Sequence, residues 1–260
     1  MLHGSPSHTP QRPGRLPKRI PMLSPKGVCV VVGCGPGLGS SIAVKFAAEG
    51  YDVAVMSRKI ESSSDALQKI KVMDRKAIYV SLDVCDEKNV KAAFAEVEEK
   101  LGDVDVLVFN ASGPMAKGGI LGMEIKTMVQ RWNVECLGAL LCARAVIPGM
   151  LRAKGGTLLF TSATSAFRGS AVLPGFAIAK FGLRALSQSI AKEYSSQGIH
   201  SCHIRIDCTL ATPKNKTKYD VEKMGDCDEI AKTYFFVSQQ NKMGWSNEID
   251  IRPHTEKWTI

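Results

Sequence analysis

The feature that most limits the fold of this chain is a regular alternation of short apolar runs with amphipathic segments of helical spacing. Seven runs have strand length, and they span residues 28–32, 52–56, 77–80, 104–109, 157–161, 199–206 and 248–251. The predicted helices span residues 40–49, 61–74, 125–151, 176–194 and 228–237, and one more begins at Asp86 as its N-cap. Since no stretch contains strands alone, the pattern predicts one α/β domain with a doubly wound, seven-stranded parallel sheet and helices on both faces.

The predicted domain covers residues 26–260 and follows a basic, proline-rich extension, residues 1–25. The extension and its boundary carry five of the nine net positive charges and no acidic residue. Its regularly spaced prolines oppose an amphipathic helix, so we expect disorder there, with organelle import as the less favoured alternative. The remaining four charges are spread over the domain, which argues against a nucleic-acid partner.

The cysteines, apolar runs and histidines indicate the cellular compartment of the chain and whether it binds a membrane or a metal. The eight cysteines form no CxxC pair, so we expect reduced thiols in a cytoplasmic protein. No run approaches the 18 or so consecutive apolar residues that span a bilayer, and no membrane partner is expected. His200 and His203 are separated by an odd number of positions on a predicted strand, so their rings should point to opposite faces and no metal site is expected.

A glycine-rich turn follows the first strand and reads Gly33-Cys34-Gly35-Pro36-Gly37-Leu38-Gly39. Glycines allow the backbone to approach a pyrophosphate closely, and the N-terminus of the next helix offers unpaired N–H groups and a partial positive charge. Glycines also serve ordinary turns, but the strand before and the helix after favour a phosphate-binding loop.

The residues at the end of the second strand indicate which dinucleotide is bound. An NAD enzyme usually carries a carboxylate there, about twenty residues after the glycines, against the ribose 2′-hydroxyl. This chain has Ser57-Arg58-Lys59 instead. A guanidinium suits a phosphate, so we expect NADP(H), although a solvated charged loop is the simpler alternative.

These motifs together resemble those of the short-chain dehydrogenase/reductase family over residues 26–252. The matching residues are Gly33, Gly37 and Gly39 of its GxxxGxG turn, Asp83 and Val84 of its acidic pair near adenine, Asn110 to Gly113 of its NNAG stretch, Asn133 as its helix asparagine and Lys180 of its YxxxK motif. The resemblance implies NAD(P)-dependent oxidoreduction of a small-molecule substrate. It also implies a homodimer or homotetramer built on the two long central helices.

The cofactor-binding residues expected from the loop positions and from the resemblance are Gly33, Gly35, Gly37, Leu38, Gly39, Ser57, Arg58, Lys59, Asp83, Val84, Asn110, Ala111, Ser112, Lys180 and Thr212.

The catalytic pattern of the family is broken at two positions. Phe176 stands where the family has the tyrosine that donates a proton, and Ala163 stands thirteen residues earlier, where it has a serine. A positioned acid contributes roughly 10²–10⁴ in rate, and one oxyanion donor about 10²–10³. Ile206-Asp207 replace the family's Pro-Gly beside the nicotinamide, and the segment between Thr212 and Asp228 is shorter than the family's substrate cover.

Two functions remain open. The first is an atypical NADP(H)-dependent oxidoreductase, acting on an activated C=C or carbonyl compound, with Asn133, Lys180, Ser162 and Thr164 as candidate catalytic residues. Hydride transfer belongs to the cofactor, so a substrate that takes its proton from water would not need the tyrosine. The second is an NADP(H)-binding protein without turnover, acting as a sensor or partner-binding module.

Overall fold

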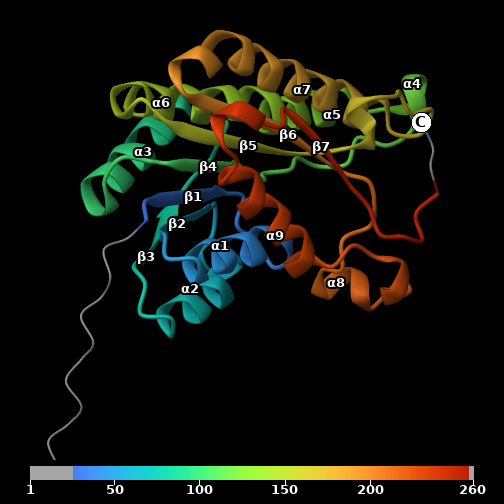
Figure 1. Ribbon diagram of the computed structural model, residues 1–260. Helices are drawn as coiled ribbons and strands as arrows, with labels where there is room; N and C mark the ends of the chain where they lie inside the picture. The colour runs from blue at the N-terminus through green and yellow to red at the C-terminus, as the bar shows by residue number, and fades with distance from the viewer. Residues whose placement is uncertain (1–25, 258–260) are drawn as a thin grey trace, which may run out of the picture.

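The computed structural model describes residues 26–257, which fold around one sheet of seven parallel strands (Figure 1). The strand order is β3-β2-β1-β4-β5-β6-β7, so the chain reverses its direction of progress between β1 and β4. The strands are β1 (Val28–Val32), β2 (Asp52–Ser57), β3 (Ala77–Ser81), β4 (Val106–Phe109), β5 (Gly156–Ala163), β6 (Ile199–Ile206) and β7 (Glu248–Ile251). The predicted doubly wound parallel sheet is therefore confirmed.

The helices are α1 (Leu38–Ala48), α2 (Ser64–Lys71), α3 (Glu87–Leu101), α4 (Gly119–Gly122), α5 (Ile125–Trp132), α6 (Gly138–Ala153), α7 (Pro174–Tyr194), α8 (Pro213–Lys216) and α9 (Cys227–Ser238). Helices α3, α6 and α7 cover one face of the sheet, and α1, α2 and α9 cover the other (Figure 1). The sheet is covered on both faces, and apolar side chains of its strands point to both. Each face therefore has its own apolar core. All five residues of β1 are buried.

The register of the central strands places their carboxyl ends side by side. Val32 of β1 pairs with Met56 of β2 and with Phe109 of β4. The turns that follow β1, β2 and β4 therefore meet at one edge of the sheet. This edge contains the reversal of strand order, where open α/β sheets bind their ligands.

The long helix expected over residues 125–151 is present but interrupted. A π-helical turn, η2 (Asn133–Leu137), joins α5 to α6. Such turns insert one residue into a helix and are frequent at functional sites. The continuous segment 125–153 has an 18-residue window of mean hydropathy 1.7, so it meets the length and composition of a membrane span, contrary to the sequence expectation. Half of that window is buried within the domain, as in the core helix of a soluble protein.

Other elements follow local sequence signals closely. Asp86 caps α3 as expected, accepting hydrogen bonds from the backbone N–H groups of Lys88 and Asn89. The helix expected over 61–74 divides into a short 3₁₀ turn (Ile60–Ser62) and α2. The short helices α4 and α8 were not predicted, since four residues carry too little periodicity to be recognised.

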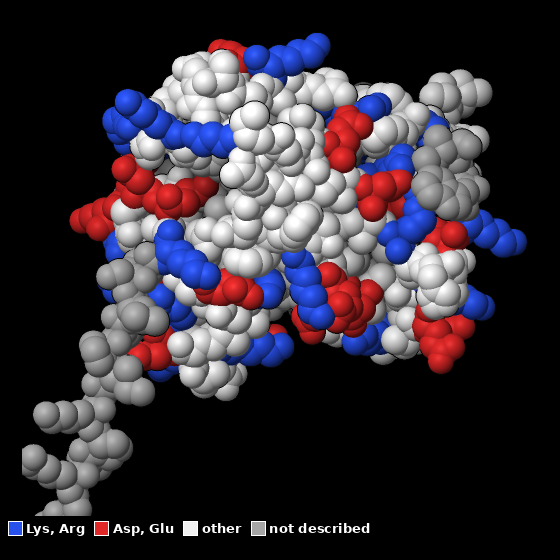
Figure 2. Space-filling model, in the orientation of Figure 1, with Lys and Arg blue, Asp and Glu red and all other residues white. Residues whose placement is uncertain are grey.

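Charges on the visible face of the molecule are mixed in sign. Figure 2 shows lysines and arginines interspersed with carboxylates around an uncharged central area. All eight cysteines are free thiols. Within residues 26–257, no group of three or more His, Cys, Asp or Glu side chains is arranged to hold a metal ion.

Candidate functional site

The turn after β1 contains three glycines, Gly33, Gly37 and Gly39, at which a side chain would cause strain or a clash, whereas the space beside Gly35 is open. Gly33 and Gly37 have φ values of 81° and 134°, in the region that favours glycine. A Cβ atom on Gly33 would lie 2.5 Å from the backbone N of Ala111, and one on Gly39 would lie 2.7 Å from the carbonyl oxygen of Gly33. Helix α1 begins at Leu38, and no side chain of the described residues caps it. Its first N–H groups can therefore bind a phosphate.

Segments far apart in the chain meet at this turn. Asn110 follows β4, and its side-chain amide donates a 3.0 Å hydrogen bond to the carbonyl oxygen of Gly33. Thr212 follows β6, and its methyl group lies 2.7 Å from where a Cβ atom of Gly37 would be. Its hydroxyl caps α8 by accepting a hydrogen bond from the N–H of Asn215. The structure thus brings the predicted residues after β1, β4 and β6 together.

The end of β2 forms the second part of the site. Ser57 donates a 2.8 Å hydrogen bond to the carbonyl oxygen of Lys59 and lies 3.1 Å from the hydroxyl of Ser63. Ser63 in turn donates to the carbonyl oxygen of Cys34 in the glycine turn. The side chains of Arg58 and Lys59 are exposed. This hydrogen-bonded scaffold leaves both cations free to meet an anion beside the turn.

The acidic pair lies next to the end of β2. Asp83 accepts a 3.0 Å hydrogen bond from the N–H of Cys85. The side chain of Val84 is buried and packs so closely on Gly138 that a Cβ atom there would lie 2.8 Å from it. Burial raises the pKa of the Cys85 thiol, Asp83 adds to that rise, and Arg58 opposes it. Arg58 is therefore within electrostatic reach of the turn that carries Asp83.

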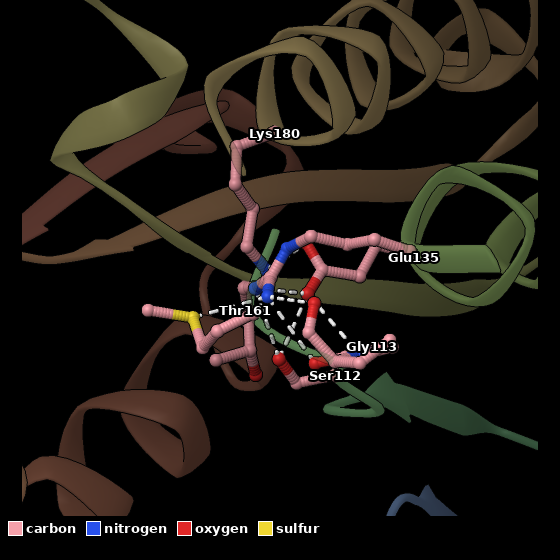
Figure 3. Close-up of polar contacts among 8 residues, drawn as sticks. Ser112, Gly113, Glu135, Thr161 and Lys180 are labelled. Carbon is pink, nitrogen blue, oxygen red and sulfur yellow. Dashed lines mark hydrogen bonds and ion pairs between the residues drawn. The ribbon is translucent and has the colours of Figure 1, made fainter. Parts of the chain in front are cut away.

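The part of the site where we expect the nicotinamide is built around the carboxylate of Glu135, which is completely buried (Figure 3). One carboxylate oxygen, Oε1, accepts hydrogen bonds from the hydroxyl of Ser112 at 2.8 Å and the N–H of Gly113 at 3.1 Å. The same oxygen accepts a 2.6 Å charge-assisted bond from Arg131. The other oxygen, Oε2, lies 3.3 Å from Nζ of Lys180. A single carboxylate thus joins the turn after β4 to α5 and α7.

Lys180 is held from two sides. Its ammonium donates a 3.1 Å hydrogen bond to the carbonyl oxygen of Thr161, near the end of β5, and forms the ion pair with Glu135. Burial lowers the pKa of Lys180, the carboxylate of Glu135 raises it, and the nearby Arg131 lowers it again. The ion pair with Glu135 therefore offsets part of the effect of burial on this lysine.

Arg131 fixes the backbone on the other side of the carboxylate. Its guanidinium is 1% exposed and donates hydrogen bonds to the carbonyl oxygens of Gly113 and Pro114 at 3.2 and 2.7 Å. Its central carbon lies 4.1 Å from the centroid of the Phe176 ring. Burial lowers the pKa of Arg131, whereas Glu135 raises it. The ring of Phe176 is therefore packed against a cation.

The structure places the four candidate catalytic residues differently. Lys180 lies at the centre of the site, but the side chain of Asn133 makes no hydrogen bond within residues 26–257. The hydroxyl of Thr164 donates to the carboxylate of Asp207, which also pairs with Arg252 at 3.3 Å. The hydroxyl of Ser162 is buried and has no hydrogen-bond partner among the described residues.

Glu135 and Arg131 were missed by sequence reasoning. One signal was available, since the two residues are four positions apart and would lie on the same face of a helix. An ion pair at that spacing is usually a solvated surface pair, and only its burial against α7 gives it a role at the site.

The residues present fit a dinucleotide. A Cβ atom at Gly33 or Gly39 would collide with neighbouring backbone, whereas the space beside Gly35 is open. Oγ of Ser162, at the carboxyl end of β5, is buried and lacks a hydrogen-bond partner among residues 26–257, while Oε2 of Glu135 has only the ion pair with Lys180. Buried polar atoms are rarely left without partners, so the hydroxyl of Ser162 suits a ligand or an ordered water.

Comparison with known proteins agrees with this geometry. Residues 27–223 match the family model described as short chain dehydrogenase. A short-chain dehydrogenase/reductase of Hericium erinaceus is 32% identical over 188 residues, which is 68% of this chain and 72% of that protein. The L-2,3-butanediol dehydrogenase of Corynebacterium glutamicum is 31% identical over 175 residues, which is 66% of this chain and 67% of that protein.

Solved structures give the same result. A short-chain dehydrogenase from Rhodopseudomonas palustris superposes with a TM-score of 0.76 at 30% identity, covering 87% of this chain and 98% of that one. An alcohol dehydrogenase from Thermococcus sibiricus shares the fold with a TM-score of 0.82 at 23% identity, covering 90% and 99% of the two chains. The chain belongs to the short-chain dehydrogenase family of NAD(P)-dependent oxidoreductases.

Proposed function

We propose that this protein is an atypical NADP(H)-dependent oxidoreductase that works without the tyrosine and serine of its family. The observation that carries the proposal is the position of Lys180, held by Thr161 and Glu135 beneath a ring that has no hydroxyl. A lysine kept charged in a buried site requires a dedicated counterion, and this chain supplies one.

The choice of NADP(H) rests on charge at the end of β2. Arg58 and Lys59 are exposed beside the glycine turn, where a 2′-phosphate would lie. A guanidinium binds a phosphate through two parallel hydrogen bonds, and the carboxyl end of β2, Met56-Ser57, has no carboxylate to hold a ribose hydroxyl. The turn after β1 and the N-terminus of α1 would hold the pyrophosphate, and Lys180 the nicotinamide ribose.

The substrate follows from what the site lacks. Phe176 and Ala163 carry no hydroxyl, and the hydroxyl of Thr164 already binds Asp207. A bound nicotinamide supplies hydride, but these side chains give the substrate no phenolic proton. The site therefore suits an activated C=C bond or a reactive carbonyl whose proton comes from water.

A second function is favoured by one observation. Arg131 packs on the ring of Phe176 and is itself tied to Glu135, so the residues around the missing phenol form a closed, charged unit. Such a unit would stabilise a bound nucleotide without donating a proton. The alternative is an NADP(H)-binding protein that senses the cofactor or presents it to a partner.

One experiment separates the two. Calorimetric titration with NADPH tests binding, and NADPH labelled with deuterium at the transferable position of C4 is then incubated with enones, quinones and diketones. Deuterium in a product, detected by mass spectrometry, is the result expected of an oxidoreductase. Tight binding with no label in any product would support the sensor, and no binding would remove both functions.

We further propose a homodimer or homotetramer built on the central helices. Exposed apolar side chains gather on α5, α6 and α7, and they are Ile125, Val129, Trp132, Leu140, Ile178 and Phe181. Their exposed fractions run from 38 to 63%, which is unusual for large apolar residues on neighbouring helices. A second copy of the chain would cover them.

A further inference from the structure

We propose that Glu135 is a positioning residue, the buried counterion that keeps Lys180 charged and aligned with the cofactor-side turn at Ser112 and Gly113. The inference rests on the proposed nucleotide-binding function of this site. It assigns a role to a residue that touches neither the glycine turn nor the end of β2.

The geometry divides the carboxylate into two halves with different tasks. Oε1 accepts three hydrogen bonds, from Ser112, Gly113 and Arg131, so its position is fixed by the turn after β4 and by α5. Oε2 accepts no hydrogen bond within the described residues and lies 3.3 Å from Nζ of Lys180. Since the first oxygen is anchored, the second is held in a fixed direction toward the lysine.

The charges explain why the carboxylate is needed. Lys180 and Arg131 are both buried, and Arg131 stays protonated because a guanidinium cannot lose its proton in a protein. Without Glu135, two cations would share one apolar site, and the lysine would be the group that gives up its proton. Among the described residues, His203 is a further titratable group near Lys180. Burial lowers the pKa of His203 to about 4, so this side chain is neutral at pH 7 and cannot replace Glu135 as a counterion.

A charged Lys180 has a donor to spare. An ammonium carries three N–H donors, and within the described residues only the one to the carbonyl oxygen of Thr161 makes a hydrogen bond, since the ion pair with Glu135 adds charge but no hydrogen bond. A donor therefore remains for a ligand hydroxyl. A neutral amine would lose both the positive charge and one donor, so nucleotide affinity should follow the protonation of this lysine.

The test replaces the carboxylate while keeping its shape. In Glu135→Gln we expect NADPH to bind at least tenfold more weakly at pH 9 than at pH 7, whereas the wild-type dissociation constant changes less than threefold. Glu124→Gln is the matched control, since it removes an exposed carboxylate just before α5 and should behave as wild type. Adding Lys180→Arg to the Gln variant should restore a flat profile, because a guanidinium stays charged.

Two further measurements keep the inference testable. If the Gln variant does not fold, Glu135→Asp retains the charge with a shorter reach and should weaken NADPH binding equally at every pH. If the wild type does not bind NADPH, the proposed function fails, and the thermal midpoint then tests the counterion alone. In the Gln variant the folded-state pKa of Lys180 would lie further below its unfolded value, so the folded state would release the lysine proton at lower pH than the unfolded state. The thermal midpoint of the variant, relative to that of the wild type, should therefore rise as the pH is raised from 7 to 10.

The outcomes are distinct. A Gln variant with the wild-type pH dependence of both affinity and thermal midpoint would show that Lys180 does not depend on this carboxylate. Equal pH dependence in Glu124→Gln would assign the effect to general charge loss. Either result overturns the inference.

Discussion

Arg131 and Phe176 lie in direct contact, with the guanidinium carbon 4.1 Å from the centroid of the ring. Nζ of Lys180 is 5.8 Å from the same centroid. Two cations therefore lie against the ring of Phe176, the residue that we expect to correspond to the family's tyrosine. A cation near an acid favours the ionised form, so a phenol placed there would have a lowered pKa.

The first prediction restores the two lost hydroxyls. The double variant Phe176→Tyr with Ala163→Ser should reduce a small reactive diketone at least about tenfold faster than wild type, a fraction of what both groups can contribute. Arg131 and Lys180 are already placed to activate the new phenol. NADPH consumption followed by absorbance, with product analysis, measures the rate.

The single variant Phe176→Tyr should gain less, because the serine orients the carbonyl that the tyrosine protonates. Two results would contradict the prediction. Brisk carbonyl reduction by the unmodified protein would reveal another acid. A double variant that binds NADPH normally and stays inert would mean that the pocket serves another chemistry.

The second prediction concerns cofactor choice. NADPH should bind more tightly than NADH, mainly through Arg58, and Arg58→Asp should erase the preference because a carboxylate repels the 2′-phosphate. Calorimetric titration of both cofactors measures it. Arg152→Asp, which reverses an exposed charge at the far end of α6, is the control that should keep the preference. Equal affinity of the wild type for both cofactors would refute the assignment of Arg58.

The third prediction is a pH dependence of stability. Burial lowers the pKa of His203 from its usual 6.5 to about 4, and neither ring nitrogen has a hydrogen-bond partner within residues 26–257. Between pH 6.5 and 4 the unfolded chain therefore binds a proton at His203 that the folded chain does not bind. This contribution leaves stability unchanged above pH 6.5 and removes up to about 1.4 kcal/mol per pH unit as the pH falls toward 4.

His203→Leu should remove this contribution. Chemical denaturation of both proteins at pH 7, 6, 5 and 4 gives the free energies of unfolding. We expect the variant to become increasingly stable relative to wild type as the pH falls. Parallel curves would show that His203 takes up its proton equally in the folded and unfolded chains, which would contradict this prediction.

The fourth prediction tests assembly. Val129→Glu with Phe181→Glu should shift the protein toward monomer in light scattering, because both side chains lie on the exposed apolar surface of α5 and α7. Phe236→Glu is the control, since Phe236 is 63% exposed but lies on α9, on the opposite face of the sheet. A monomeric wild type would remove the proposed interface.

The fifth prediction concerns the N-terminal extension, which lies outside the described residues. Deleting residues 1–24 should leave the thermal midpoint nearly unchanged, because prolines and charges give the extension little to bury. Differential scanning calorimetry of the full and shortened chains provides the comparison. A drop of several degrees would show that the extension packs on the domain.

Much of the fold was readable from local pattern. Val28–Val32 is a continuous apolar run, as expected of a buried parallel strand, and it was predicted at its observed bounds. Ile199–Ile206 was also predicted at its observed bounds, although polar residues interrupt its apolar ones. The cap at Asp86 and the glycine turn also depend on neighbouring residues alone. The residues expected at the phosphates come together because parallel strands align their carboxyl ends, a consequence of the sheet order.

The nicotinamide end could not be read in this way. The sequence by itself determined that Phe176 and Ala163 lack hydroxyls and that Lys180 is present. Only the tertiary structure decided what surrounds that lysine, because the π-helical turn and the packing of α5 on α7 bring Glu135 into a dry site. The same ion pair on a solvated helix would contribute little, whereas burial removes competing water and makes the protonation of Lys180 depend on it.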